Sequence, residues 1–211
     1  MRKIFIITLV IFHLIIEIAY SQKQKKNLFK ITSFSLQFAG STGFLTGGIF
    51  KSTKNDKLEL GLLYGYTPES LGGSLHSISF KVGYNPFKIN LNKSLIIEPL
   101  QVGAFLNQNF GKDLDFGWPD KYPTSYYWWT PSLREHIFIG SSISLQTTKS
   151  KWLHHVSLYF EANTNDLYLA SYFGENNIKS LSLYDITFFG TGLKFYLHSK
   201  KTKVNETDTN D

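Results

Sequence analysis

The chain has 211 residues, no cysteine and a formal net charge of +6. This length fits a single domain, and without cysteine the chain can have neither a disulfide framework nor a lipid-modified N-terminal cysteine. The lysines lie in short connections rather than in a stripe interleaved with aromatic residues, so we expect no nucleic-acid partner. Contact with anionic lipid headgroups is the more natural use of the basic residues.

Residues 1–21 have the pattern of a secretory signal peptide. Arg2 and Lys3 precede an apolar run, and a small-residue site ends at Ser21. The apolar run ends at Glu17, which makes it shorter than the roughly 20 residues that a membrane-spanning helix needs. We therefore expect cleavage near Ser21, export of the mature chain, and a basic linker over residues 22–29.

The body of the chain, residues 30–197, alternates between apolar and polar side chains in short segments. In the clearest segment, Leu158 and Phe160 share one face, whereas Ser157 and Glu161 share the other. This period of two is typical of strands with one apolar and one polar face. The predicted strands cover about residues 31–39, 44–51, 57–66, 75–84, 94–107, 134–145, 153–163 and 181–197, with long loops over about 108–133 and 164–180.

The fifth predicted strand, about residues 94–107, has an irregular pattern. Pro99 interrupts it, and the polar residues Glu98 and Gln101 fall on opposite faces of a regular strand. A β-bulge between them would bring both side chains to the same face. We therefore predict a bulge at this point.

Export and composition together indicate that lipid surrounds the apolar faces. After the N-terminal segment the chain has no apolar run of 18 residues, so a closed barrel is the remaining way to cross a bilayer. Aromatic residues make up 16% of the chain, which suits the aromatic girdles of membrane barrels. The sequence therefore predicts an all-β fold, an eight-stranded antiparallel up-and-down transmembrane β-barrel in the outer membrane of a Gram-negative bacterium. Side chains fill a barrel of this size, so we expect no porin-like conduction.

Three groups of residues carry a resemblance to a protein family. They are Leu63-Tyr64-Gly65-Tyr66 with Pro68, Ser70, Gly72 and Gly73; Tyr122-Pro123 with Tyr126-Tyr127-Trp128-Trp129; and Thr164-Asn165-Asp166-Leu167-Tyr168. Across most of the mature chain, the sequence resembles uncharacterised small outer-membrane β-barrel proteins of Gram-negative bacteria. The resemblance implies a barrel and an envelope location and brings no activity or ligand. Many outer-membrane barrels end on an aromatic residue, whereas this chain continues past Leu197 into a polar tail, residues 198–211, which we expect to be disordered.

Four charged residues have the inward parity of four different predicted strands. They are Glu59, Lys81, Glu161 and Lys194. Buried charges need partners, so we expect these residues to form ion pairs that plug a narrow lumen. Passage of protons or ions is the alternative interpretation.

A catalytic interpretation depends on Ser74 and His76. Some small outer-membrane barrels are lipid A deacylases that use a serine, a histidine and an acid. Ser74 and His76 lie at the outer end of the fourth predicted strand, but no acid is placed to orient the histidine, as a triad requires. His155 and Ser157 share a face with Glu161 but follow a turn on the periplasmic side. We therefore expect no enzymatic activity, with a lipid A-modifying hydrolase as the alternative.

A loop dense in aromatic residues precedes the sixth predicted strand. Its aromatic residues are Trp118, Tyr122, Tyr126, Tyr127, Trp128 and Trp129. An exposed set of this kind suggests a surface that binds a glycan or a protein. The alternative is that these rings complete the outer aromatic girdle and cover the barrel mouth.

The remaining expectations concern metals, partners and the direction of the apolar face. The histidines are scattered, and His154 and His155 should point to opposite faces of a strand, so we expect no metal site and no cofactor. The predicted partners are membrane lipids and lipopolysaccharide, and the predicted role is structural or surface-binding. In a soluble lipocalin-like periplasmic barrel, the alternative, the apolar face would point inward. We predict that Leu60, Phe80 and Leu158 point outward.

Overall fold

The computed structural model describes residues 31–53, 57–71, 73–111, 130–147, 150–174 and 180–198. The predicted signal peptide, the linker, the aromatic loop at 118–129 and the tail beyond 198 lie outside the described residues. The strands are β1 (Ser33–Ala39), β2 (Leu45–Ser52), β3 (Leu58–Thr67), β4 (Leu75–Tyr84), β5 (Ile89–Asn90), β6 (Leu95–Phe110), β7 (Leu133–Gln146), β8 (Leu153–Asn165) and β9 (Phe188–Leu197). Among the described residues, no helix is long and apolar enough to cross a bilayer.

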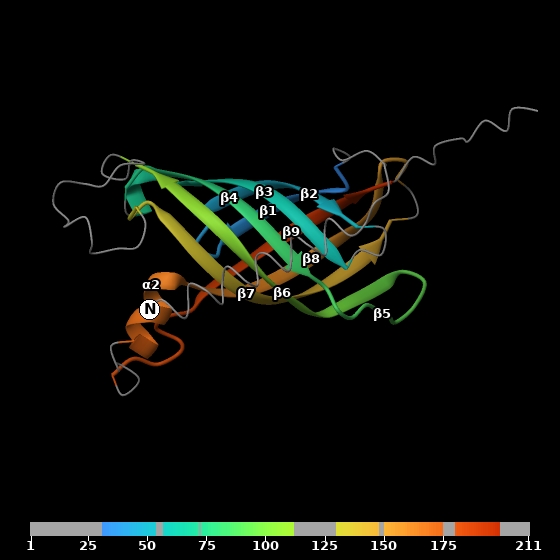
Figure 1. Cartoon of the computed structure of the whole chain (residues 1–211). Helices are drawn as coiled ribbons and strands as arrows, with labels where there is room; N and C mark the ends of the chain where they lie inside the picture. Colours follow the sequence, from blue (N-terminus) through green and yellow to red (C-terminus); the bar gives the residue numbers. More distant parts are fainter. Residues whose placement is uncertain are drawn as a thin grey trace, which may run out of the picture. The chain divides into compact units, whose positions relative to one another are not determined.

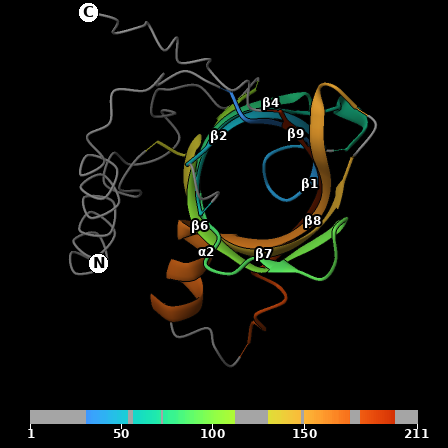
Figure 2. The same cartoon turned by 90° about the vertical axis from the view of Figure 1, so that its right-hand side faces the viewer.

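Eight of these strands form a closed antiparallel barrel. Each strand pairs with its neighbours along the chain, β4 pairs with β6, and β1 pairs with β9, which closes the ring. Figure 2 shows this ring in a view along the barrel. The short strand β5 pairs with β6 beyond the ring (Figure 1). The predicted eight-stranded up-and-down barrel is therefore confirmed.

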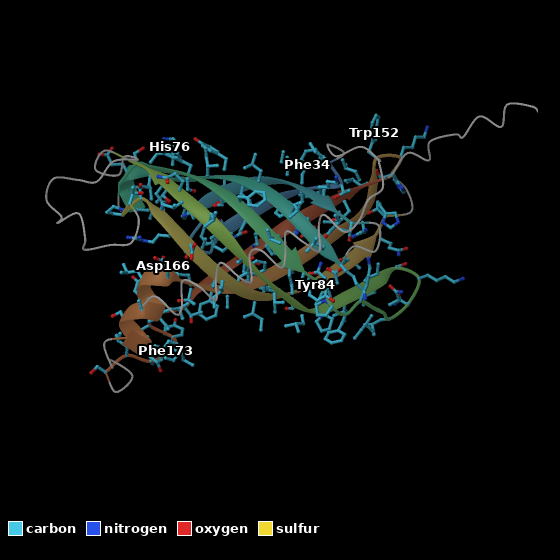
Figure 3. The ribbon with its side chains drawn as sticks, in the orientation of Figure 1. Phe34, His76, Tyr84, Trp152, Asp166 and Phe173 are labelled. Atoms are coloured by element: carbon cyan, nitrogen blue, oxygen red, sulfur yellow. The ribbon has the colours of Figure 1, made fainter. Side chains whose placement is uncertain are left out.

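The two ends of the barrel differ in their connections. Strands β2, β4 and β7 end, and β3, β6 and β8 begin, at the end where β1 begins and β9 ends, which we name the turn end. The opposite end of the barrel, which includes residues 40–44, 73–74, 130–132 and 166–174, we name the loop end. Figure 3 places His76 and Asp166 at the loop end and Trp152 at the turn end.

The alternation in the sequence corresponds to an inner and an outer face. Leu60, Phe80 and Leu158 point outward, with exposed fractions of 37%, 44% and 42%. Their neighbours of opposite parity, such as Glu59 and Lys81, are buried inside the barrel. The apolar face of the sheet is therefore the outer face, and the interior is mainly polar.

The bulge predicted in the irregular strand is confirmed. The pairing of β6 with β7 shifts register between Glu98 and Gln101, on either side of Pro99. Glu98, the last paired residue before the shift, is buried and accepts a hydrogen bond from Ser142 Oγ at 3.0 Å. Proline cannot donate to the ladder, which explains why the register breaks at this point.

The prediction for the last strand is wrong at its start. Residues 181–187 are not part of the strand, because Asp185 Oδ2 accepts hydrogen bonds from the Ser182 amide and hydroxyl, both at 2.8 Å, and closes a turn. The alternation of Leu181 and Leu183 with serines resembles a strand, but β9 begins only at Phe188.

Other boundaries and one loop also differ from prediction. The region expected to be a loop after the seventh predicted strand begins instead with helix α2 (Asp166–Leu169), followed by the π-helical turn η2 (Ala170–Gly174). The Asn165 side chain caps α2 by accepting from the Tyr168 amide at 2.9 Å. Strand β6 continues to Phe110, where a loop was expected from residue 108, and neither β5 nor the 3-10 turn η1 (Glu69–Leu71) was predicted.

Candidate functional site

Two ion pairs cross the interior of the barrel. Lys81 of β4 donates to Glu161 of β8, and Lys194 of β9 donates to Glu59 of β3 with a distance of 2.6 Å between Nζ and Oε2. All four side chains are less than 10% exposed. These are the four charges that the sequence places on the inward face, and the structure brings them together as two pairs.

Aromatic rings surround each buried ammonium group. Lys81 Nζ lies 4.1 Å from the centre of the Phe138 ring, and Lys194 Nζ lies 4.1 Å from that of Phe50. Both rings are nearly fully buried. The attraction of a cation to the face of a ring adds to the carboxylate contact and compensates part of the lost hydration. Rings and ion pairs therefore pack together inside the barrel.

The connection between β1 and β2 folds into the mouth of the barrel at the loop end. Figure 2 shows this segment inside the ring of strands. Its carbonyl oxygens accept hydrogen bonds from inward side chains of four strands. The donors are Gln37 Nε2 to Ala39 (3.0 Å), Asn163 Nδ2 to Gly40 (2.9 Å), Asn107 Nδ2 to Ser41 (3.1 Å) and Ser77 Oγ to Thr42. We name residues 39–43 the inward turn.

The backbone of the inward turn is strained. Ala39 and Ser41 have φ values of 60° and 68°, in a region that residues with a Cβ rarely adopt. Gly40 and Gly43, with φ of 82° and 139°, avoid the corresponding steric cost. Such a conformation persists only where the surroundings enforce it. The donors from β1, β4, β6 and β8 provide that enforcement.

Two hydrogen bonds and one cation–ring contact connect the inward turn with the Lys194–Glu59 ion pair. The Tyr159 hydroxyl donates to Gln37 Oε1 at 3.0 Å, and Gln37 in turn donates to the inward turn. The Lys194 ammonium lies 5.5 Å from the centre of the Tyr159 ring. The interior thus contains both paired side chains and, at its mouth, the backbone of the inward turn.

Ser74 and His76 do not form a catalytic site with an acid. Both are exposed at the loop end, and His76 Nδ1 lies 2.6 Å from the Tyr64 hydroxyl on the outer face. The His76 ring also lies 5.0 Å from that of Tyr66. A triad needs an acid that orients the histidine, and among the described residues no carboxylate forms an ion pair with His76.

The second serine–histidine set is also engaged elsewhere. Ser157 hydrogen-bonds to Ser144, His155 stacks on Tyr196 with ring centres 4.0 Å apart, and Glu161 holds Lys81. Each of the three side chains therefore has a partner outside the set. This arrangement does not form a nucleophile, base and orienting acid.

His154 is exposed and His155 is buried, which agrees with the expectation that they occupy opposite faces. Their Nδ1 atoms nevertheless lie 2.7 Å apart, at the point where the pairing of β8 with β9 shifts register between Leu153 and His155. The His198 ring lies 5.4 Å from that of His154. In the described part of the chain, no group of three or more histidine, aspartate or glutamate side chains could hold a metal ion.

The outer wall carries a continuous set of exposed apolar side chains. Ile137, Ile139 and Phe160 are each more than half exposed, as is Leu62 on the opposite side of the ring. Further members are Leu36, Ile49, Leu60, Ile78, Phe80, Ile143, Leu158 and Leu193. We name this set the apolar belt. Tyrosines flank it at the loop end (Tyr64, Tyr66), and Tyr84 and Trp152 flank it at the turn end.

The fold and the lumen define the class of protein as a closed eight-stranded antiparallel barrel with a filled, polar interior. Comparison with protein-family models, with curated proteins and with solved structures finds no match. The barrel itself shows no particular role.

Sequence reasoning missed the residues that hold the inward turn. Gln37, Ser77, Asn107 and Asn163 all have the inward parity near the loop end. Their signal is that amide side chains recur at inward positions near the loop end, and that the segment Gly40-Ser41-Thr42-Gly43 follows the first predicted strand. The alternation along a strand indicates which face a side chain occupies but not which group it contacts. That signal could therefore have identified the donors but not the path of the inward turn.

Proposed function

We propose that this protein is an outer-membrane β-barrel of a Gram-negative bacterium, exported by its N-terminal segment, with a structural or surface-binding role and no conducting pore. The observation that carries the proposal is the apolar belt, because soluble monomers rarely expose apolar patches larger than a few hundred Å². The tyrosines and tryptophan that border the belt suit the two lipid interfaces of a membrane barrel.

The interior supports the same proposal. A lipocalin-like barrel needs an apolar lumen that is open to a ligand, whereas this lumen contains two ion pairs and the inward turn. A porin needs a continuous aqueous path, which an interior filled by side chains and backbone obstructs. Lipids, including lipopolysaccharide, are the proposed partners of the outer wall, and glycans or proteins are the proposed partners of the loop end.

Cell fractionation tests the proposal. After expression in a Gram-negative host, we expect the chain in the outer-membrane fraction, resistant to carbonate extraction, and faster on a detergent gel before boiling than after it. In planar bilayers the purified barrel should give no stepwise conductance, with a known porin as the positive control. Recovery of the folded chain in the soluble periplasm would contradict the membrane proposal, and stepwise conductance would contradict the closed lumen.

A further inference from the structure

The connection between β8 and β9 leaves the barrel sideways rather than along its axis. We name its described residues, 166–174 and 180–187, the side segment. Figure 1 shows α2 and the residues after it beside the wall at the loop end, and Figure 2 shows them outside the ring of strands. In Figure 3, Phe173 lies farther from the wall than Asp166. The side segment therefore extends laterally from the end of the apolar belt.

The side segment is ordered by its own contacts. Ile186 and Tyr172 are buried, with exposed fractions of 2% and 9%. The Ser182 amide and hydroxyl both donate to Asp185, which holds the pKa of that carboxyl below its ordinary value. The Thr187 hydroxyl donates to the Leu183 carbonyl at 2.6 Å. Residues 182–187 thus form a hydrogen-bonded turn within the side segment.

Rings join the side segment to the barrel wall. The Tyr168 ring lies 5.4 Å from that of Phe188, and the Tyr184 ring lies 5.9 Å from that of Phe189. Phe189 is itself an outward residue, 58% exposed. Exposed rings therefore extend from Phe189 on the outer wall onto Tyr184 of the side segment.

Three large apolar side chains of the side segment are strongly exposed. Leu183 and Tyr184 occupy the turn closed by Asp185 and are 62% and 75% exposed, and Phe173 is 62% exposed. Turn positions that face water are ordinarily polar. A turn that holds two large apolar side chains outward suits the boundary between lipid headgroups and acyl chains, where tyrosine and phenylalanine bury their rings.

We propose that the side segment lies in the lipid interface around the loop end of the barrel, with Phe173, Leu183 and Tyr184 inserted among the headgroups. This inference rests on the proposed membrane location. It assigns a partner to the exposed surface of the side segment, namely the lipid interface of the leaflet at the loop end. The side segment is not one of the strands that close the barrel. In that position the segment widens the lipid contact of the barrel on one side, near β7 and β8.

Site-specific labelling tests the inference, and the absence of cysteine allows single-cysteine variants without other changes. The variants Phe173→Cys and Tyr184→Cys carry an environment-sensitive fluorophore in the full chain, reconstituted in phosphatidylethanolamine and phosphatidylglycerol vesicles. Leu60→Cys on the apolar belt is the lipid reference, and Lys93→Cys at the turn end is the water reference. Nitroxides attached near the lipid headgroup or deep on the acyl chain measure the depth of each label.

We expect labels at 173 and 184 to lose fluorescence with the shallow nitroxide and to be protected from iodide, whereas the label at 93 is quenched by iodide. If the label at 60 is quenched by lipid nitroxides while those at 173 and 184 are quenched only by iodide, the side segment lies in water and the inference is wrong. If the label at 60 also escapes lipid nitroxides, the membrane proposal itself fails. The two failures are therefore distinguishable.

Discussion

Each buried lysine of the lumen contacts one carboxylate and at least one aromatic ring. Lys81 lies between Glu161 and Phe138, and Lys194 lies between Glu59 and Phe50. A lysine in this position is only 7–8% exposed, so the carboxylate is the main group that can balance its charge. The energetic role of each pair is therefore best measured by removing the partners one at a time and together.

At this scale we predict strong coupling between Lys81 and Glu161. Lys81→Met or Glu161→Gln alone should lower the free energy of unfolding by about 3–5 kcal/mol, because either change leaves a buried charge without its partner. The double variant should recover much of that loss, since no net charge then remains buried. Urea unfolding of the barrel in lipid vesicles, followed by gel mobility, measures all three.

Lys57 provides the control for this cycle, because it is an exposed lysine at the turn end. Lys57→Met should change the free energy of unfolding by less than about 0.5 kcal/mol. Equal losses in the single and double variants of the buried pair, with no recovery, would show that the pair is not coupled.

At the scale of elements, the inward turn packs against strand β3 at a position where β3 has a glycine and therefore no side chain. A Cβ added to Gly65 of β3 would overlap the Thr42 carbonyl and lie 2.5 Å from Ser77 Oγ. The obstacle is mainly backbone, which cannot move aside without displacing the inward turn. Gly47 on the adjacent strand has no atom within 4 Å of such a Cβ.

We therefore predict opposite outcomes for two glycine-to-alanine changes on neighbouring strands. Gly65→Ala should destabilise the barrel by about 1–3 kcal/mol through overpacking, whereas Gly47→Ala should be neutral within about 0.5 kcal/mol. Urea unfolding midpoints measure both effects. A neutral Gly65→Ala variant would mean that the inward turn is not seated in the mouth as described.

The sequence pattern was informative about strands and much less about their connections. Alternation reports which face a side chain occupies, so it predicted the barrel, the outward direction of Leu60 and the bulge near Pro99. It could not separate residues 181–187 from the following strand, because leucines alternate with serines there while the Ser182–Asp185 hydrogen bonds form a turn. It also gave the face but not the partner of Lys81, since pairing across a lumen depends on register and barrel diameter.

At the scale of the whole molecule, the barrel has its polar residues inside and its apolar residues outside. In water this arrangement would expose the apolar belt and bury charges, both unfavourable. In a bilayer the same arrangement is favourable, because acyl chains cover the belt and the ion pairs remain enclosed. Whether lipid or water surrounds the outer wall can therefore be tested by placing a charge at different positions along the wall.

We predict that the cost of a charge on the outer wall depends on its depth. Leu158 lies near the middle of β8 and Trp152 at the turn end, and they are 42% and 78% exposed. In vesicles, Leu158→Arg should reduce the free energy of unfolding by about 2–4 kcal/mol and Trp152→Arg by about 0–1 kcal/mol, as expected for the bilayer centre and its interface. A water-exposed wall would tolerate both changes within about 0.5 kcal/mol, because surface substitutions rarely cost more. Equal, small effects at the two positions would therefore contradict a lipid-facing belt, even if the barrel itself were folded.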